Sequence, residues 1–157
     1  MKKPNPKAYR KVSKTSVEIT RLIDALDFTD LKPELVQLGW SDEEIAYVIS
    51  KYRNFLYLCA TTGEVIVPTH EIDIVWHIHI LDTIKYRNDC DAVFGFYLDH
   101  YPYLGKRGDK EEFNAAFEAT CQIYEVTFGE PYRVAQAISL VPGLASKIAK
   151  EDGANCG

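Results

Sequence analysis

The sequence predicts an all-α protein, a single compact helical bundle around a central buried helix, with an aromatic, histidine-containing loop. Apolar residues recur three or four positions apart in nearly every segment, which is the spacing of amphipathic helices. Residues 69–90, THEIDIVWHIHILDTIKYRNDC, are apolar around most of their circumference when drawn as one helix. One narrow stripe is expected to face solvent, formed by Glu71, Asp82, Lys85 and Asp89. Such a helix belongs in the middle of a domain, which favours a bundle.

Three helices are expected before the central one. A stripe of apolar residues predicts a helix over residues 16–27, and a proline near the start with a glycine at the end predicts a short second helix over 33–39. Ser41 and Glu44 have the spacing of a capping box, in which each side chain bonds the backbone amide of the other residue. A third helix is therefore expected from there to about residue 59.

The segments around and after the central helix follow from turn and cap signals. Residues 64–67 form either an extended link or a single strand, and Thr69 can cap the central helix. Glycines and a proline in residues 91–108 prevent a continuous helix there, so this aromatic stretch is predicted to be a loop. Residues 109–128 predict another helix, and residues 132–150 one more, interrupted by a Pro-Gly step.

The composition divides the chain into three parts. Residues 1–13 are expected to form a flexible basic N-terminal arm, residues 14–132 the helical domain, and residues 133–157 a C-terminal helical segment and disordered tail.

The bulk composition argues against binding to nucleic acids or membranes. The net charge is −5, whereas a phosphate-binding surface needs concentrated Lys and Arg, and the basic arm is interpreted as solvated. No window approaches the roughly 18 apolar residues of a membrane-spanning helix, and no apolar region follows the basic N-terminus as in a secretory signal. The four cysteines are scattered without a CxxC pair, which fits reduced thiols, so a cytoplasmic location is expected.

The central segment carries a possible metal-ligand pattern. Asp73 and His77 are four positions apart and His70 is seven before His77, so all three project from one face of a helix. A carboxylate with imidazoles suits Zn, Fe(II) or Mn(II). The missing ligand would come from His100 in the aromatic loop, so one divalent ion, Zn or Fe, held by Asp73, His77 and His100, is predicted. In the alternative, Asp73 caps the helix or forms a salt bridge and His77 bonds a buried carbonyl.

His79 poses a separate problem. On an ideal helix it lies about 200° from His77, so one ion cannot bind both unless the helix is distorted. An extended segment would point both the same way. If the helix continues, His79 falls in a row with Tyr86 and Cys90, and we expect it to bond Tyr86. His79 and Cys90 would then lie about 16 Å apart along the axis, which disfavours a cysteine hydrolase.

The loop over residues 94–105 alternates aromatic residues with His100 and other polar groups. It is either a packed lid or the wall of a pocket in which His100 is a ligand or an acid–base group, and the two readings are compatible. Tyrosine hydroxyls of this loop would need polar partners if buried. The residues expected to line the pocket or orient its ligands are His70, Trp76, His79, Tyr86, Cys90, Asp99 and Tyr103.

Three strings, PTHEID at 68–73, VWHIHILDT at 75–83 and HYPYLG at 100–105, resemble the glycine-rich domain-containing protein-like family, in particular its compact bacterial members. The resemblance covers about residues 33–132, and it implies that the WHxH helix and the histidine loop form one unit. It implies no particular reaction, and this chain lacks the glycine-rich region of the larger plant proteins. Bacterial members of the family tend to carry two adjacent histidines before the aromatic-proline step of this loop. This chain has Asp99 and His100 at those two positions.

Two functions from different classes are expected. The first is a small helical domain with a metal-binding His/Asp pocket; as an enzyme it would carry out metal-assisted hydrolysis or oxidation. The second is a non-catalytic protein-interaction module whose histidines are core groups. In that case residues 132–150 would dock a protein partner or a second copy of the chain.

Overall fold

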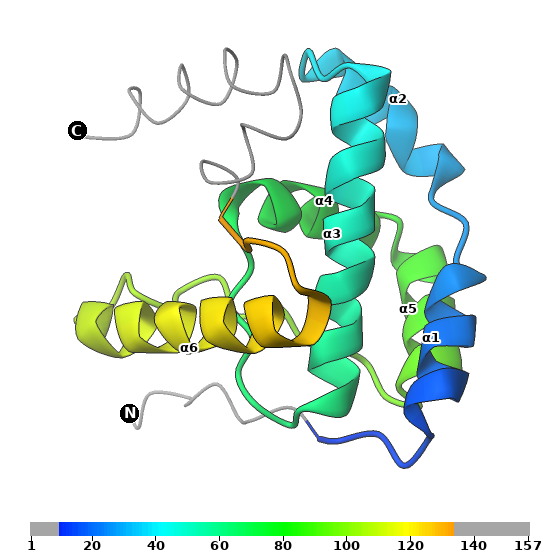
Figure 1. Ribbon diagram of the computed structural model, residues 1–157. Coiled ribbons are helices and arrows are strands. Elements are labelled where there is room, and N and C mark those ends of the chain that lie inside the picture. The colour runs from blue at the N-terminus through cyan, green and yellow to red at the C-terminus, as the bar shows by residue number, and fades with distance from the viewer. Residues whose placement is uncertain (1–9, 134–157) are drawn as a thin grey trace. The chain divides into compact units, whose positions relative to one another are not determined.

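The computed structural model describes residues 10–133, and within that range it is helical, with no strand (Figure 1). The all-α prediction is therefore confirmed. The elements in chain order are α1 Ser16–Asp24, the 3-10 turn η1 Thr29–Leu31, α2 Lys32–Gln37, α3 Asp42–Thr61, α4 His70–Leu81, α5 Thr83–Val93 and α6 Lys110–Phe128. None of the helices in this part of the chain is long and apolar enough to cross a membrane.

The chain divides into two compact units between Thr120 and Cys121, within α6. The second unit is aromatic in its described part: the ring centroid of Tyr124 lies 4.7 Å from that of Phe128 and 4.7 Å from that of Tyr132. The predicted arm at 1–13 lies mostly outside the described residues, and the segment 134–157, which holds most of the predicted docking stretch, lies wholly outside them.

Local capping explains where the helices of the first unit begin. Thr15 and Glu18 cap α1 reciprocally, and the predicted box of Ser41 and Glu44 opens α3, with the Glu44 amide donating to Ser41 Oγ at 3.2 Å. The Thr69 hydroxyl accepts from the third amide of α4, as expected. Each box satisfies amides that a helix start leaves without partners, which fixes these ends.

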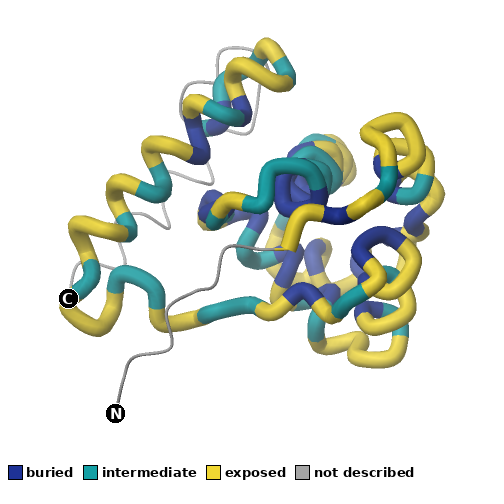
Figure 2. The backbone as a smooth tube through the Cα atoms, turned by 90° about the horizontal axis from the view of Figure 1, so that it is seen from below, coloured by how far each residue is buried: buried dark blue, intermediate teal, exposed yellow. Residues whose placement is uncertain are grey.

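The core of the first unit lies where α3 packs against α1, α2 and α4. Large side chains of α3 and α4 fill it, among them Tyr52, Phe55, Ile72 and Trp76, each almost fully buried. Buried and exposed positions alternate along each helix, as expected for helices that turn one side inward (Figure 2). Residues 64–67 contain no strand and form an irregular link with a bend at Glu64.

The prediction of one helix over 69–90 is wrong. The chain breaks at Asp82, whose ψ of 75° is not helical, and the Asp82 carboxylate accepts from the Lys85 amide to cap α5. An aspartate cap competes with helix continuation because it satisfies the first amides of a new helix. The break changes which side chains face solvent: Leu81 and Ile84, apolar residues of the segment expected to lie in the middle of the domain, are 80% and 72% exposed.

The solvent stripe predicted for this segment is also partly wrong. Glu71 is buried, and Asp89 is half-buried because it pairs with His79.

Candidate metal centre

Asp73, His77 and His100 form a cluster at the edge of α4, which we call the open cluster. The His100 Nε2 lies 2.6 Å from Asp73 Oδ1, and His77 Nδ1 lies 3.7 Å from Asp73 Oδ2. The two imidazole rings are 4.5 Å apart between centroids. Their side chains are 52% exposed for His77, 32% for Asp73 and 13% for His100. One donor atom from each residue therefore lies within 4.8 Å of the other two, and solvent reaches the group.

Two features of the sequence place these donors. Asp73 and His77 are one turn apart on α4, so the helix itself sets their spacing. His100 comes from the loop after α5, 27 residues from Asp73, and its ring lies 4.3 Å from that of Trp76. The loop must therefore be held against α4 for the cluster to exist.

A buried hydrogen-bond relay holds the loop there. The Trp76 indole N–H donates to the Tyr86 hydroxyl at 2.9 Å, and that hydroxyl donates to the Leu98 carbonyl at 2.5 Å. Burial raises the pKa of Tyr86 well above its usual range, so its proton stays available for this bond. The relay joins α4 and α5 to the loop at Leu98, two residues before His100, so Trp76 and Tyr86 hold this part of the loop in place.

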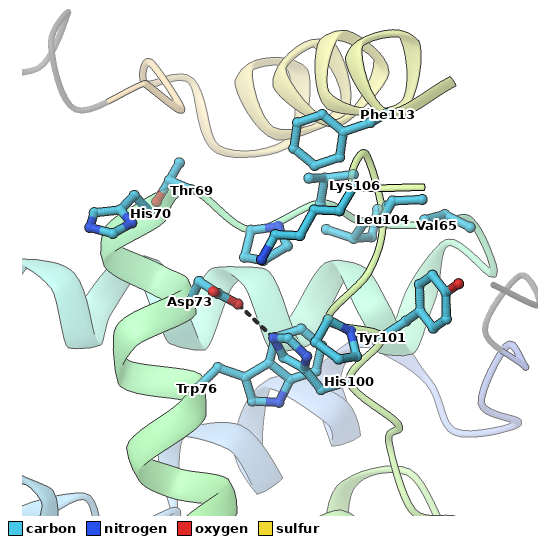
Figure 3. A pocket seen from close by; sticks show the side chains of 14 residues that line it. Val65, Thr69, His70, Asp73, Trp76, His100, Tyr101, Leu104, Lys106 and Phe113 are labelled. Atoms are coloured by element: carbon cyan, nitrogen blue, oxygen red, sulfur yellow. Dashed lines mark hydrogen bonds and ion pairs between the residues drawn. The ribbon is translucent and has the colours of Figure 1, made fainter. Parts of the chain in front are cut away.

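A pocket of about 300 Å³ adjoins the open cluster (Figure 3). Asp73, Trp76 and His100 form one side, and the labelled side chains of Lys106 and Phe113 lie across from them. The other residues that line it are Val65, Ile66, Val67, Pro68, Thr69, His70, Tyr101, Pro102 and Leu104.

A glycine lets the loop close against α6. Gly105 has φ of +79°, and a Cβ there would lie 2.9 Å from Phe113 Cγ. Side chains other than glycine rarely adopt this backbone conformation and would also collide with the Phe113 ring. The last residue of the HYPYLG string is therefore required by the close approach of the loop to Phe113.

The open cluster fits a divalent ion. Protein donors bind Zn at about 2.1 Å, so two donors around a tetrahedral ion lie about 3.4 Å apart. The His100–Asp73 Oδ1 spacing of 2.6 Å and the His77–Asp73 Oδ2 spacing of 3.7 Å lie on either side of this value. One donor atom from each residue lies within 4.8 Å of the other two, so side-chain rotations would bring a set of three donors to it. An ion would take the place of the hydrogen bond between His100 and Asp73. Two imidazoles and one carboxylate suit Zn or Fe(II) and leave coordination positions for a ligand.

His79 belongs to a different group on the opposite flank of α4, which we call the closed cluster. Its Nδ1 lies 2.8 Å from the Tyr52 hydroxyl and its Nε2 lies 2.8 Å from Asp89 Oδ2, which Lys85 Nζ also contacts at 2.8 Å. Burial lowers the pKa of His79, although Asp89 acts in the opposite direction. We therefore assign a neutral ring that donates from Nε2 to Asp89 and accepts at Nδ1 from Tyr52.

The predicted bond between His79 and Tyr86 is wrong. Their rings meet edge to face at 4.8 Å, while the Tyr86 hydroxyl is used by Trp76 and Leu98. Cys90 is buried beside Tyr86, and burial raises the pKa of its thiol. A protonated, buried thiol is a poor nucleophile, which removes the argument for a cysteine hydrolase.

The remaining predicted pocket residues have separate places. His70 lines the pocket and is exposed, outside the three-donor cluster. Asp99 is exposed next to His100, and Tyr103 is 44% exposed and stacks on the Arg107 guanidinium at 3.8 Å, away from the pocket lining.

Sequence reasoning missed residues of the closed cluster and of the pocket. Tyr52 and Asp89 were not expected as partners of His79, and Lys106 and Phe113 were not expected at the pocket. The available signal was the pair of basic residues, Lys106 and Arg107, that directly follows the HYPYLG string.

Comparisons with known proteins agree with the expected family. The family described as UCP032817-like matches residues 23–153. The chain is 32% identical over 104 residues to glycine-rich domain-containing protein 2 of Arabidopsis thaliana, a match that covers 63% of this chain and 13% of the relative. It is 31% identical over 103 residues to glycine-rich domain-containing protein 1 of the same plant, covering 62% of this chain and 13% of the relative.

The resemblance to glycine-rich domain-containing proteins is thus confirmed, for a chain that spans about an eighth of those relatives' length. No solved structure gives a significant match.

Proposed function

We propose that this chain, which belongs to the UCP032817-like family, binds one divalent metal ion, Zn or Fe(II), through Asp73, His77 and His100. The observation that carries the proposal is the convergence of one carboxylate and two imidazoles to within 4.8 Å at the edge of a pocket. The pocket would supply the space for a molecule bound beside the ion.

The bonding of His77 supports metal binding over a purely structural role. In the structural alternative His77 bonds a buried carbonyl, yet within the described residues its only polar contact is the 3.7 Å approach to Asp73, and its side chain is 52% exposed. Structural histidines are usually buried and bonded at both ring nitrogens, as His79 is. A half-exposed imidazole aimed at a carboxylate and a second imidazole is better explained as a ligand.

The chemistry that such a centre offers is that of a Lewis acid with free coordination positions. A bound ion of this kind polarises a carbonyl or lowers the pKa of a coordinated water. Metal-assisted hydrolysis or oxidation is therefore the reaction class we propose if the protein is an enzyme. The chain's own contribution is to orient the ligands: Trp76 packs against His100, and Tyr86 fixes the loop.

A cytoplasmic location is part of the proposal. Cys59 and Cys90 are buried thiols that form no disulfide within the described residues, and burial raises the pKa of both. Unpaired, protonated thiols support a reducing compartment.

The test is calorimetric titration of the full-length chain with Zn(II), and with Fe(II) under anaerobic conditions. We expect one ion per chain, and His77→Ala should weaken metal binding more than ten-fold. Mutation of residues that only hydrogen-bond to metal ligands typically weakens binding ten-fold or more, so loss of a ligand should cost at least as much. His70→Ala is the matched control, because it removes an exposed imidazole of the same pocket that is not in the cluster. Absence of binding, or equal affinity in wild type and His77→Ala, would contradict the proposal.

A second candidate is an interaction module. Leu81 and Ile84 are large apolar side chains left exposed at the break between α4 and α5, and such side chains often mark contact sites. Residues 132–150 stay a predicted docking segment for a protein partner or a second copy, largely outside the described residues. Sedimentation of Leu81→Ser/Ile84→Ser against wild type tests this candidate: an unchanged mass at all concentrations argues against self-association through these residues.

A further inference from the structure

We infer that the pocket beside the open cluster takes a small diacid, with one acidic group on the metal ion and the other at Lys106. This inference rests on the proposed function, because it requires the ion. It assigns Lys106 a ligand-binding role and names the class of molecule that the site accepts.

The first observation is the position of Lys106. Its side chain lines the pocket and extends inward toward the side that carries Asp73, across from His100 (Figure 3). Its Nζ has no ion-pair or hydrogen-bond partner within residues 10–133. An ammonium group directed into a pocket without a protein partner is available to an acidic group of a ligand.

The loop fixes the origin of this side chain. The Lys106 amide donates to the Tyr103 carbonyl at 3.0 Å, and the preceding Gly105 sits against Phe113. Lys106 therefore starts from a defined turn, which limits the entropy lost when it engages a ligand.

The second observation is the charge of the lining. Its two groups with a formal charge at neutral pH are Asp73 and Lys106, which cancel. A divalent ion on the open cluster would raise the local charge to about plus two, since the ligating imidazoles stay neutral. A ligand with two ionised acidic groups would balance that charge.

The third observation is the size and polarity of the space between the two charges. The volume of about 300 Å³ is at the small end for ligand pockets. Apolar side chains, including Val67, Leu104 and Phe113, line the region and suit a short aliphatic spacer. A compact dicarboxylate or a similar short diacid meets these requirements, whereas a large or purely apolar ligand does not.

The test compares glutarate with valerate, five-carbon acids that carry two and one carboxylates. Each is titrated into the full-length protein, first alone and then loaded with one equivalent of Zn(II). We expect glutarate to bind the zinc-loaded protein more tightly than valerate does, and to bind weakly without zinc. Lys106→Gln should weaken glutarate about five-fold, the size of one partly exposed ion pair, and leave zinc and valerate affinities unchanged.

The matched control is Lys110→Gln, which removes the same charge from an exposed lysine outside the pocket lining. It should leave glutarate affinity unchanged. Zinc binding without a preference for glutarate, or a preference that survives Lys106→Gln, overturns this inference and leaves the metal proposal standing. Failure of the protein to bind zinc overturns both.

Discussion

Helix α4 carries two histidines, His77 and His79, in opposite chemical states. His79 is 2% exposed in its side chain, and both of its ring nitrogens are bonded, one to Tyr52 and one to Asp89. His77 is half-exposed and makes one long approach to a carboxylate. Two residues of separation on a helix are enough to place one imidazole in the core and the other at the surface.

This difference shows which histidines are free to act. In the closed cluster both ring nitrogens of His79 already have partners, so an ion could bind the ring only by displacing one of its two hydrogen bonds. In the open cluster the bond between Asp73 and His100 is the one close contact, and an ion would replace it with stronger interactions. Whether a histidine is available to bind a metal ion therefore depends on its exposure and on the hydrogen bonds that its ring already makes. The residue type alone does not reveal this.

The largest expected effect is on stability. His79→Ala should lower the free energy of unfolding by about 3 kcal/mol, because it leaves a cavity and removes a partner from both Tyr52 and Asp89. His77→Ala should change it by less than about 0.5 kcal/mol, as for most exposed side chains. Urea denaturation of both variants measures the difference. Equal losses of stability would contradict the claim that His79 supports the fold and His77 does not.

A smaller effect is expected from the glycine that shapes the pocket. Gly105→Ala should cost about 2 kcal/mol, from a strained backbone and collision with Phe113, and should weaken zinc binding by displacing the His100 loop. Gly95→Ala is the control: its φ is +75°, but a Cβ there meets nothing within 4 Å, so about 1 kcal/mol is expected. Urea denaturation and zinc titration of both glycine variants test this prediction. Equal losses of stability in Gly105→Ala and Gly95→Ala would show that contact with Phe113 adds nothing to the cost.

The smallest effect is a pH dependence from the closed cluster. Burial lowers the pKa of His79 below its ordinary 6.5, so below that pH the unfolded chain binds a proton that the folded chain does not. The free energy of unfolding should therefore fall as the pH drops below 6.5 toward the pKa of His79 in the folded protein. Above pH 6.5 this histidine should contribute no pH dependence. Unfolding measured from about pH 7.5 to 5.5 should show a shallower slope in His79→Gln than in His77→Gln. Identical slopes would contradict a neutral, buried His79.

The local parts of this structure were predictable from sequence. The capping box of Ser41 and Glu44 depends on residues three apart, and the shared face of Asp73 and His77 depends on residues four apart. The separation of His77 from His79 also follows from helical geometry alone. Each of these features is set within one helical turn.

The rest depends on contacts between distant residues. Asp82 could have continued the helix or capped a new one, and a single sequence does not decide between these outcomes. The partner of His79 is Tyr52, 27 residues away, so no local pattern identifies it. The orientation of Lys106 into the pocket likewise depends on how the loop packs on Phe113.

Metal binding at the open cluster is tested by following the nitrogen resonances of the histidine rings during titration of the full-length protein with Zn(II). We predict that Nδ1 of His77 and Nε2 of His100 shift to values typical of metal-bound nitrogen, and that one equivalent of zinc is sufficient for both. The resonances of His79 should stay those of a neutral ring protonated at Nε2. Unchanged resonances of His77 and His100, or zinc-dependent shifts at His79 in their place, would contradict metal binding at the open cluster.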